Sequence, residues 1–444
     1  MTKICFVSPC KPIMCGIADY TGFVANHLPP SKWAALSFDP QKYGAPLVGD
    51  GQARANQIWY GLSPHNRFSA SILRKGLEWL GYRHNHATLW FQHEFGIWPD
   101  QQKFVSMLND LAETKVVSLH TLHFQSQETH SGLRASEYEL LRAMLPYVEA
   151  ITVFSHGVYR AVTSAFPEHR AKVYVIKHGI HSYPDVARMS RKEAKEKLND
   201  FLLYESGLSQ NVRNALHNQR IFLDPRITVI GQTGFLCPLK DSGLLYRVRD
   251  RMQKDIPSKR IVAVRIGPPR DTTQEAYAEE LRQQQNCTDK FILKTWLPPD
   301  MLPVSQKAFD INWFWPKDCT QSGIVAHALG AGAIIAGRDF EGAGETFKEA
   351  GAINATRPRQ LARKMRGLIL NPGLCETLEE KALKYAARYS WENQARAHSI
   401  LAKRLLQVHA KNPIVHPTSQ SMPLALDVLL HDMIAEPPMT TSAR

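Results

Sequence analysis

Short apolar runs alternate with longer amphipathic stretches along most of the chain, and this alternation is the feature that most constrains its fold. Continuous apolar runs bounded by polar residues, glycine or proline are typical of strands buried on both faces. In the first half such runs lie at 3–7, 88–92, 115–119, 150–154 and 173–176, with helical patterns between them at 19–28, 101–113 and 136–144. Strand and helix in alternation predict a parallel sheet with helices on both faces, connected by right-handed crossovers.

The second half of the chain repeats this pattern. Apolar runs lie at 226–231, 260–266, 291–293 and 332–336. Between the halves, residues 184–222 are charged and helix-forming, and Ser190 with Glu193 predicts a capping box. We therefore expect an α/β chain of two doubly wound, Rossmann-like domains. The expected divisions are a first domain over 1–183, a charged helical linker or insertion over 184–222, a second domain over 223–388, a helix over 389–410 and a tail over 411–444.

Charge and cysteine content narrow the setting. Lysine and arginine number 54 against 41 acidic residues, a formal charge of +13 that predicts a polyanionic partner, an anionic membrane surface or a phosphorylated substrate. No segment approaches the roughly 20 apolar residues that span a bilayer, and the start of the chain resembles a buried strand more than a signal peptide. The 7 scattered cysteines favour reduced thiols and a cytoplasmic location, and their spacing predicts no metal site.

Histidines follow three of the predicted strands in the first domain. His93 and Glu94 come after the run at 88–92, His120 after 115–119, and His178 after 173–176. Ligands of open parallel sheets bind at the carboxyl ends of the strands. Imidazoles donate hydrogen bonds to sugar hydroxyls and phosphate oxygens, so three at one sheet edge favour a ligand site over separate structural roles.

Other loops of the two domains carry features that suit an anion. Gly16 opens a helix after the first strand, where backbone N–H groups approach a phosphate closely. Lys240 lies in a loop before a helix, which makes it a candidate phosphate partner. Ser322 and Gly323 begin a helix of small residues and offer free N–H groups to a phosphate or a ribose.

These segments, in this order, resemble the family 4 (group 1) glycosyltransferases, which are retaining enzymes with the GT-B fold. The resembling segments are GIADY at 16–20, QHEFGI at 92–97, LHT at 119–121, HGI at 178–180, GFLCPLKDSG at 234–243, SGIVAHALGAGAIIA at 322–336 and YSWE at 389–392. The resemblance covers roughly residues 1–408. It implies two Rossmann-like domains facing across a cleft, with the final helix crossing back to the first domain.

The resemblance also implies roles for individual residues. Lys240 would bind the donor diphosphate, and His120 would lie near the transferred sugar; these two are the catalytic candidates. Lysine and helix N-termini suit this reaction because they stabilise the oxygens that gain charge as the diphosphate leaves. The candidate donor-binding residues are Gly16, Phe235, Lys240, Arg265, Ser322, Gly323 and His327, and the candidate acceptor- or sugar-binding residues are Asp19, His93, Glu94 and His178.

The sequence departs from the family pattern at three positions. Cys319 and His327 stand where the family has a pair of glutamates, and Phe235 replaces the arginine that usually accompanies the diphosphate lysine. We assign Arg265 as the candidate for the missing second cation. These departures leave the contact to the ribose without an assigned residue.

The expected function is transfer of a sugar from a nucleotide-sugar, UDP-, GDP- or similar, to an acceptor hydroxyl, with no metal and no prosthetic group. A polysaccharide, a lipid-linked sugar or a small metabolite are the acceptors considered, with the protein cytoplasmic or peripheral to the inner face of the membrane. Two alternatives stay open: a DNA glycosyltransferase acting on hydroxymethylated pyrimidines, and a non-catalytic GT-B scaffold. No G-x-G-x-x-G follows the first strand, which argues against a dinucleotide-dependent dehydrogenase.

Overall fold

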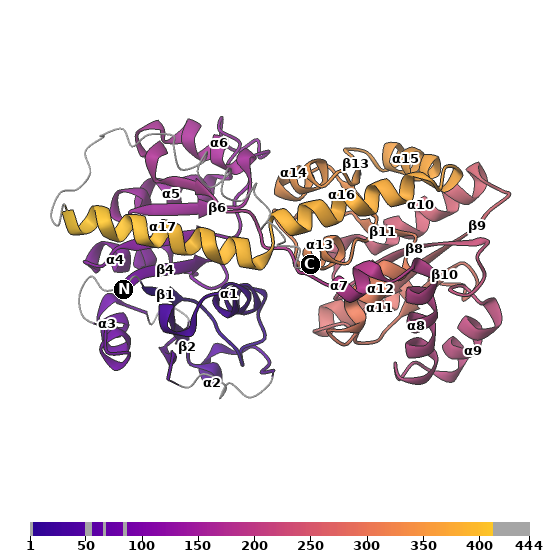
Figure 1. The fold of residues 1–444 in the computed structure, drawn as a ribbon, viewed down its shortest axis with the longest axis horizontal. Coiled ribbons are helices and arrows are strands. Elements are labelled where there is room, and N and C mark those ends of the chain that lie inside the picture. Colours follow the sequence, from indigo (N-terminus) through magenta and orange to yellow (C-terminus); the bar gives the residue numbers. More distant parts are fainter. Residues whose placement is uncertain (1–2, 49–55, 65–67, 83–86, 412–444) are drawn as a thin grey trace, which may run out of the picture. The chain divides into compact units, whose positions relative to one another are not determined.

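The protein is described from a computed structural model, which describes residues 3–48, 56–64, 68–82 and 87–411 (Figure 1). Within these residues the chain divides into two compact units. The first contains the described residues up to Gly179 together with those from Tyr389 onward, and the second contains Ile180–Arg388. The tail expected over 411–444 lies outside the described residues, apart from Lys411 at the end of the last helix.

The described residues of the first unit form a seven-stranded parallel sheet. Its strands, in spatial order, are β3 (Ile58–Leu62), β2 (Trp33–Phe38), β1 (Lys3–Val7), β4 (Ala87–His93), β5 (Lys115–Leu119), β6 (Ala150–Val153) and β7 (Val173–Val175). Strand β1 pairs in parallel with both β2 and β4, which places Cys5 beside Ala34 and Leu89. The order of the strands reverses between β1 and β4.

Two hydrophobic layers cover the first sheet. On one face, α1 (Gly16–Asn26) and α17 (Trp391–Lys411) pack against Ile4, Phe6 and Trp90. Figure 1 shows α17 lying along this unit although it comes from the far end of the chain. The other face is covered by α3 (Ala70–Trp79), α4 (Gln101–Asp110), α5 (Ala135–Met144) and α6 (His156–Ala165).

The second unit has a six-stranded parallel sheet with the same kind of reversal, between β8 and β11. Its strands, in spatial order, are β10 (Lys290–Leu293), β9 (Arg260–Ile266), β8 (Ile227–Thr233), β11 (Ile311–Phe314), β12 (Ile335–Arg338) and β13 (Ile353–Ala355). Its longer helices are α8 (Arg191–Tyr204), α9 (Gln210–Gln219), α10 (Ser242–Asp255), α11 (Thr272–Arg282), α12 (Met301–Ala308), α13 (Gly323–Gly330), α14 (Glu341–Glu349), α15 (Pro358–Leu370) and α16 (Leu374–Arg388).

The expected class, two doubly wound α/β domains with parallel sheets, is confirmed. One predicted strand begins later than expected: the run at 332–336 becomes strand only from Ile335. Gly332 has φ +64°, and the N–H of Ala333 bonds to the carbonyl of Ala328. These residues therefore close the C-terminus of α13 in the way a left-handed glycine commonly does, and cannot join the sheet.

Most of residues 184–222 are helical. They form a short helix α7 (Pro184–Arg188) followed by α8 and α9, and α8 packs against α12 of the second unit. The capping box at the start of α8 is confirmed. The Ser190 hydroxyl accepts from the Glu193 N–H at 3.2 Å, and the Glu193 carboxylate accepts from the Ser190 N–H at 2.8 Å.

No helix among the described residues combines the length and the apolar character that crossing a membrane requires.

Candidate functional site

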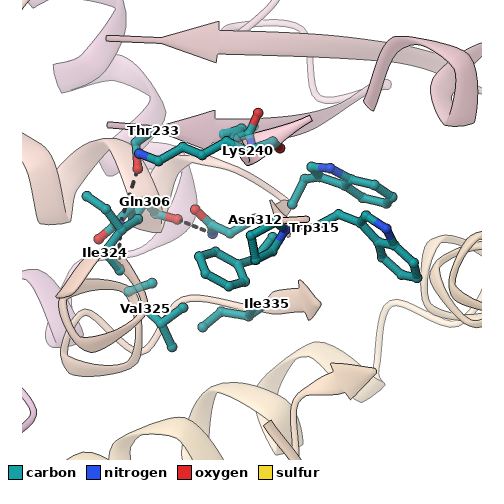
Figure 2. Close-up of a pocket in the computed structure, with 14 residues that line it drawn as sticks. Thr233, Lys240, Gln306, Asn312, Trp315, Ile324, Val325 and Ile335 are labelled. Atoms are coloured by element: carbon teal, nitrogen blue, oxygen red, sulfur yellow. Dashed lines mark hydrogen bonds between the residues drawn. The ribbon is translucent and has the colours of Figure 1, made fainter. Parts of the chain in front are cut away.

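A pocket lies at the strand-order reversal of the second unit, where β8 and β11 run side by side (Figure 2). It holds about 430 Å³ of empty space, including the part open to solvent. Reversals of this kind leave a crevice at the carboxyl ends of parallel strands, because the connecting helices depart to opposite faces. The pocket is lined by Gly231, Gln232, Thr233, Lys240, Gln306, Asn312, Trp313, Phe314, Trp315, Pro316, Ile324, Val325, Ala328 and Ile335.

Lys240 brings a cation to this pocket. It ends a single 3-10 turn, Pro238–Lys240, and its side chain runs across the pocket toward Thr233 (Figure 2). Among the described residues, no hydrogen bond or ion pair engages its ammonium group. Burial, and then the positive charge of Arg265, lower the pKa of Lys240 to about 7. An ammonium group in this position is stabilised by an anionic ligand.

A polar frame joins the strands to the start of α13. The Gln306 amide donates to the Thr233 hydroxyl at 3.3 Å and to the Ile324 carbonyl at 3.0 Å, and the Asn312 amide donates to the Gln306 carbonyl at 2.8 Å. Gln306 and Asn312 were not among the predicted site residues. Asn312 could have been noticed in the sequence, because it is a polar residue inside the otherwise apolar run at 311–315.

Helix α13 begins beside the pocket, where Ile324 and Val325 line it. Ser322 is the N-cap residue, and its side chain makes no capping hydrogen bond. Gly323 is exposed. The first N–H groups of a helix have no partner within the helix and carry partial positive charge, so this end of α13 suits an anion.

Arg265 does not face the pocket. It is fully buried in β9, and its five N–H groups all have acceptors within the protein. These acceptors are Ser242 Oγ (3.0 Å) and the carbonyl oxygens of Gln232 (3.2 Å), Ile266 (2.6 Å), Gly234 (2.7 Å) and Phe235 (2.6 Å). A guanidinium with every donor committed has none left for a phosphate. The arrangement therefore does not support the expectation that Arg265 contacts the donor directly.

Phe235 and His327 are also absent from the lining of the pocket. The Phe235 ring lies 6.1 Å from that of Trp296, and its carbonyl is held by Arg265. The His327 ring stacks on that of His181, with centroids 3.9 Å apart, and its Nδ1 pairs with the hydroxyl of Tyr183. His327 thus joins α13 to the segment that opens the second unit.

In the first unit, two of the predicted histidines gather around one tyrosine. Tyr20 of α1 lies 4.8 Å from His120 and 5.5 Å from His178, measured between ring centroids. The Tyr20 ring also contacts that of Trp391 of α17, at 5.2 Å, and the Trp391 ring lies 5.3 Å from that of His178. His120 Nε2 also pairs with the side-chain oxygen of Gln92, at 2.6 Å. Burial lowers the pKa of His120 to about 3 and that of His178 to about 4, so both rings are neutral at pH 7.

The remaining predicted residues of the first unit make other side-chain contacts. His93 is 1% exposed and pairs with Gln101 at 3.0 Å, so it has no open surface for a sugar. Glu94 accepts from the Thr121 hydroxyl, and burial raises the pKa of its carboxyl. Asp19 is partly exposed and forms an ion pair with Lys11, at 2.6 Å. Gly16 begins α1 with no described atom within 4 Å of where a Cβ would lie.

Comparison with solved structures identifies the fold. Anabaena Alr3699/HepE aligns with a TM-score of 0.62 at 14% identity, over 90% of this chain and 100% of that one. An α,α-trehalose-phosphate synthase (UDP-forming) from Burkholderia vietnamiensis gives 0.64 at 15%, over 94% and 100%. A glycosyltransferase from Rickettsia africae gives 0.62 at 11%, over 91% and 99%. The chain has the GT-B fold. No protein-family model and no curated protein sequence matches it.

The GT-B fold accounts for the position of the pocket, since each of its domains is a doubly wound sheet with a reversal of strand order. Of the predicted donor-binding residues, Lys240 lines this pocket, and Ser322 and Gly323 directly precede two residues that do. Phe235 lies in the loop between β8 and Lys240, and Arg265 donates to its carbonyl, whereas the His327 ring stacks on that of His181. Gly16 belongs to the first unit.

Proposed function

We propose that this protein is a glycosyltransferase that moves a sugar from a nucleotide-sugar to an acceptor hydroxyl. The observation that carries the proposal is Lys240, whose ammonium has no partner among the described residues and faces a pocket at a strand-order reversal. Two of the similar structures support the choice of donor. Anabaena Alr3699/HepE is described in complex with UDP-glucose, and the trehalose-phosphate synthase is described as UDP-forming.

In the proposed reaction, the bond between the sugar and the diphosphate breaks and a bond to the acceptor oxygen forms. The diphosphate leaves with the bonding electrons and the acceptor hydroxyl gives up its proton, so the diphosphate oxygens gain negative charge. The Lys240 ammonium and the N–H groups at the start of α13 stabilise that charge, and they do so more strongly in a pocket than in water. We propose that the transfer retains the configuration of the sugar and needs no metal. The anomeric configuration of the product, and activity in the presence of EDTA, test these two points.

We assign the acceptor to the first unit, with Asp19, Glu94, His120 and His178 as the candidate contacts. A polysaccharide or a lipid-linked sugar is the proposed acceptor class. The formal charge of +13 exceeds what one diphosphate requires, and it suits an acceptor or a membrane surface that is anionic. Sugar transfer to hydroxymethylated DNA can be measured with the same donor. If DNA accepts the sugar and glycans do not, DNA is the acceptor in place of a polysaccharide or a lipid-linked sugar.

Thermal unfolding with UDP-, GDP-, ADP- and dTDP-glucose tests donor binding, because a ligand of the native state raises the melting temperature. At least one donor is expected to stabilise the wild-type protein. Lys240→Met is expected to abolish that shift, since it removes the cation with little change in volume. The matched control is Lys254→Met, an exposed lysine on α10, which should leave the shift unchanged.

A second measurement separates an enzyme from a scaffold. Release of the nucleoside diphosphate from the stabilising donor, at high enzyme concentration, is expected for the wild-type protein and is expected to fall at least about 100-fold for Lys240→Met. Binding without turnover, with or without acceptors, would favour the non-catalytic scaffold. Absence of both binding and turnover would overturn the proposed function.

A further inference from the structure

Arg265 is a buried cation. Its N–H groups are hydrogen-bonded within the protein, but no negative charge in the described part of the chain neutralises it. Its side chain is 0% exposed, and its five N–H groups donate to four carbonyl oxygens and the Ser242 hydroxyl. Burying a charged group is strongly unfavourable unless every donor finds an acceptor, and here every donor does. All five acceptors are neutral, and among the described residues no ion pair engages this guanidinium. Its positive charge therefore acts on the surrounding residues.

Two of the five acceptors of Arg265 belong to the loop that leads from β8 to Lys240, and the others lie in β8, in β9 and at the start of α10. One of its terminal nitrogens bonds to the carbonyls of both Gly234 and Phe235. Gly234 has φ +99°, a conformation that glycine adopts without strain. A Cβ at Gly267, the residue after β9, would lie 1.9 Å from the Gly234 carbonyl oxygen, so the two loops are in close contact. Arg265 therefore holds the backbone turn at 234–235 in place through these hydrogen bonds.

Lys240 also lies against the turn at 234–235. A Cβ at Gly234 would be 2.7 Å from the Lys240 Nζ, so the ammonium group rests on that glycine. The other titratable groups that face Lys240 are Arg265 and the thiols of Cys237 and Cys319. Burial raises the pKa of Cys319 to about 12, which keeps its thiol neutral and leaves the two cations without an anionic neighbour in this set.

The positive charges of Lys240 and Arg265 both lie against the turn at 234–235. Together they favour an anion that carries more than one negative charge. Each cation disfavours the charge of the other, and the positive charge of Arg265 contributes to the lowered pKa of Lys240. An anion bound to Lys240 relieves this repulsion. Arg265 thereby strengthens the binding of a diphosphate that it does not touch.

We propose that Arg265 is a positioning residue for the diphosphate of the donor: it shapes the turn at 234–235 and supplies the second positive charge through space. The proposal rests on the proposed function, since it presupposes that the pocket takes a nucleoside diphosphate. Phe235 carries no charge and cannot act as the second cation beside Lys240. The proposal assigns that role to Arg265 of β9.

Calorimetric titration with UDP, GDP and ADP between pH 6 and pH 9 tests the proposal. In the wild-type protein the affinity is expected to fall above about pH 7, as the Lys240 ammonium loses its proton. Arg265→Met removes the neighbouring charge, so the midpoint of this fall should move up by about one pH unit. At pH 6 the same variant should bind about tenfold more weakly, because one cation is missing. Arg363→Met, an exposed arginine on α15, is the matched control and should change neither value.

Arg265→Lys separates charge from geometry. Lysine keeps the charge but offers three N–H donors in place of five, so the midpoint should stay while the affinity falls. Ser242→Ala removes one acceptor of Arg265 and should likewise weaken binding at least threefold with the midpoint unchanged. These two variants carry the test if Arg265→Met does not fold, as judged by circular dichroism.

The outcomes distinguish this inference from the function on which it rests. If the wild-type protein binds none of the three diphosphates at any pH, both proposals fail. If it binds, and Arg265→Met weakens binding equally at every pH with the midpoint in place, Arg265 is structural only and this inference alone fails. Unchanged affinity in Arg265→Lys and Ser242→Ala would overturn it as well.

Discussion

The rings of Tyr20 and His120 lie perpendicular to one another, with their centroids 4.8 Å apart. Tyr20 belongs to α1, and His120 follows β5. Tyr20 also contacts Trp391 of α17, a helix that comes from the opposite end of the chain. The position of the catalytic candidate in the first unit therefore depends on two helices that cover one face of the sheet, and edge-to-face contacts of this kind are favourable.

The hydroxyl of Tyr20 is buried and, among the described residues, has no hydrogen-bond partner. Tyr20→Phe is therefore expected to raise the free energy of unfolding by about 1 kcal/mol, since it removes a buried hydroxyl that has no partner. Tyr20→Ala should cost about 4 kcal/mol through the cavity it leaves. Urea unfolding measures both. The matched control is Tyr246→Phe, because the buried Tyr246 hydroxyl donates to the Phe291 carbonyl at 3.0 Å and its loss should cost about 1 kcal/mol.

His120→Ala should lower the rate of transfer while leaving the affinity for UDP within about twofold, a change of less than 0.5 kcal/mol. The reason is that His120 lies in the first unit, whereas the residues that line the pocket belong to the second. Initial rates and calorimetric titration give the two values. His130→Ala, an exposed histidine of the same unit, is the control. An equal loss of rate and of affinity would point to a structural role for His120.

Buried histidines make the stability of the first unit depend on pH. Burial lowers the pKa of His398 from 6.5 to about 4. Between these values the unfolded chain binds a proton that the folded chain does not, so stability decreases as the pH falls through this window. For His398 alone the loss at pH 5 is about 2 kcal/mol. Urea unfolding at pH 7.5 and pH 5 should therefore show a smaller difference in His398→Gln than in the wild-type protein, whereas His217→Gln, at an exposed site, should retain the full difference.

Helix α13 has a glycine at each end, and only one of them is tightly packed. A Cβ at Gly330 would lie 2.1 Å from the backbone oxygen of His181, whereas one at Gly323 would meet no described atom within 4 Å. Gly330→Ala should therefore destabilise the protein by about 2 kcal/mol, because the backbone at His181 must move. Gly323→Ala should lie within about 0.5 kcal/mol of the wild-type protein. Similar thermal unfolding of the two variants would contradict this account of the packing.

Burial separates most of the predicted strands from the missed ones, although β2, which is buried at every position, was also missed. Strands such as β1, β5 and β9 are buried on both faces and read as continuous apolar runs. Strand β3 at the edge of the first sheet is half-buried, and β13 at the edge of the second has only three residues, so neither has a strong pattern. Strand β11 contains Asn312, which is tolerated there because its amide donates to the carbonyls of Gln306 and Ile334.

The candidate site was predictable in part. Lys240 was predicted because it lies in a loop that follows a predicted strand, and Ser322 and Gly323 were predicted because they begin a predicted helix. Gln306 was missed, since its amide reaches the pocket from α12 and nothing in the run at 301–308 marks it as functional.

By itself, the sequence determined the α/β class and the position of Lys240 in a loop after a strand. Hydrophobic burial is not directional, so the spacing of apolar residues is enough to indicate it. Only the tertiary structure decided what the polar residues do. His93 and His120 both end strands of one sheet, yet one pairs with Gln101 inside the core and the other meets Tyr20. Arg265 was expected at the ligand and is instead committed to five acceptors of its own chain. Hydrogen bonds are directional, and their partners come from segments that only folding brings together.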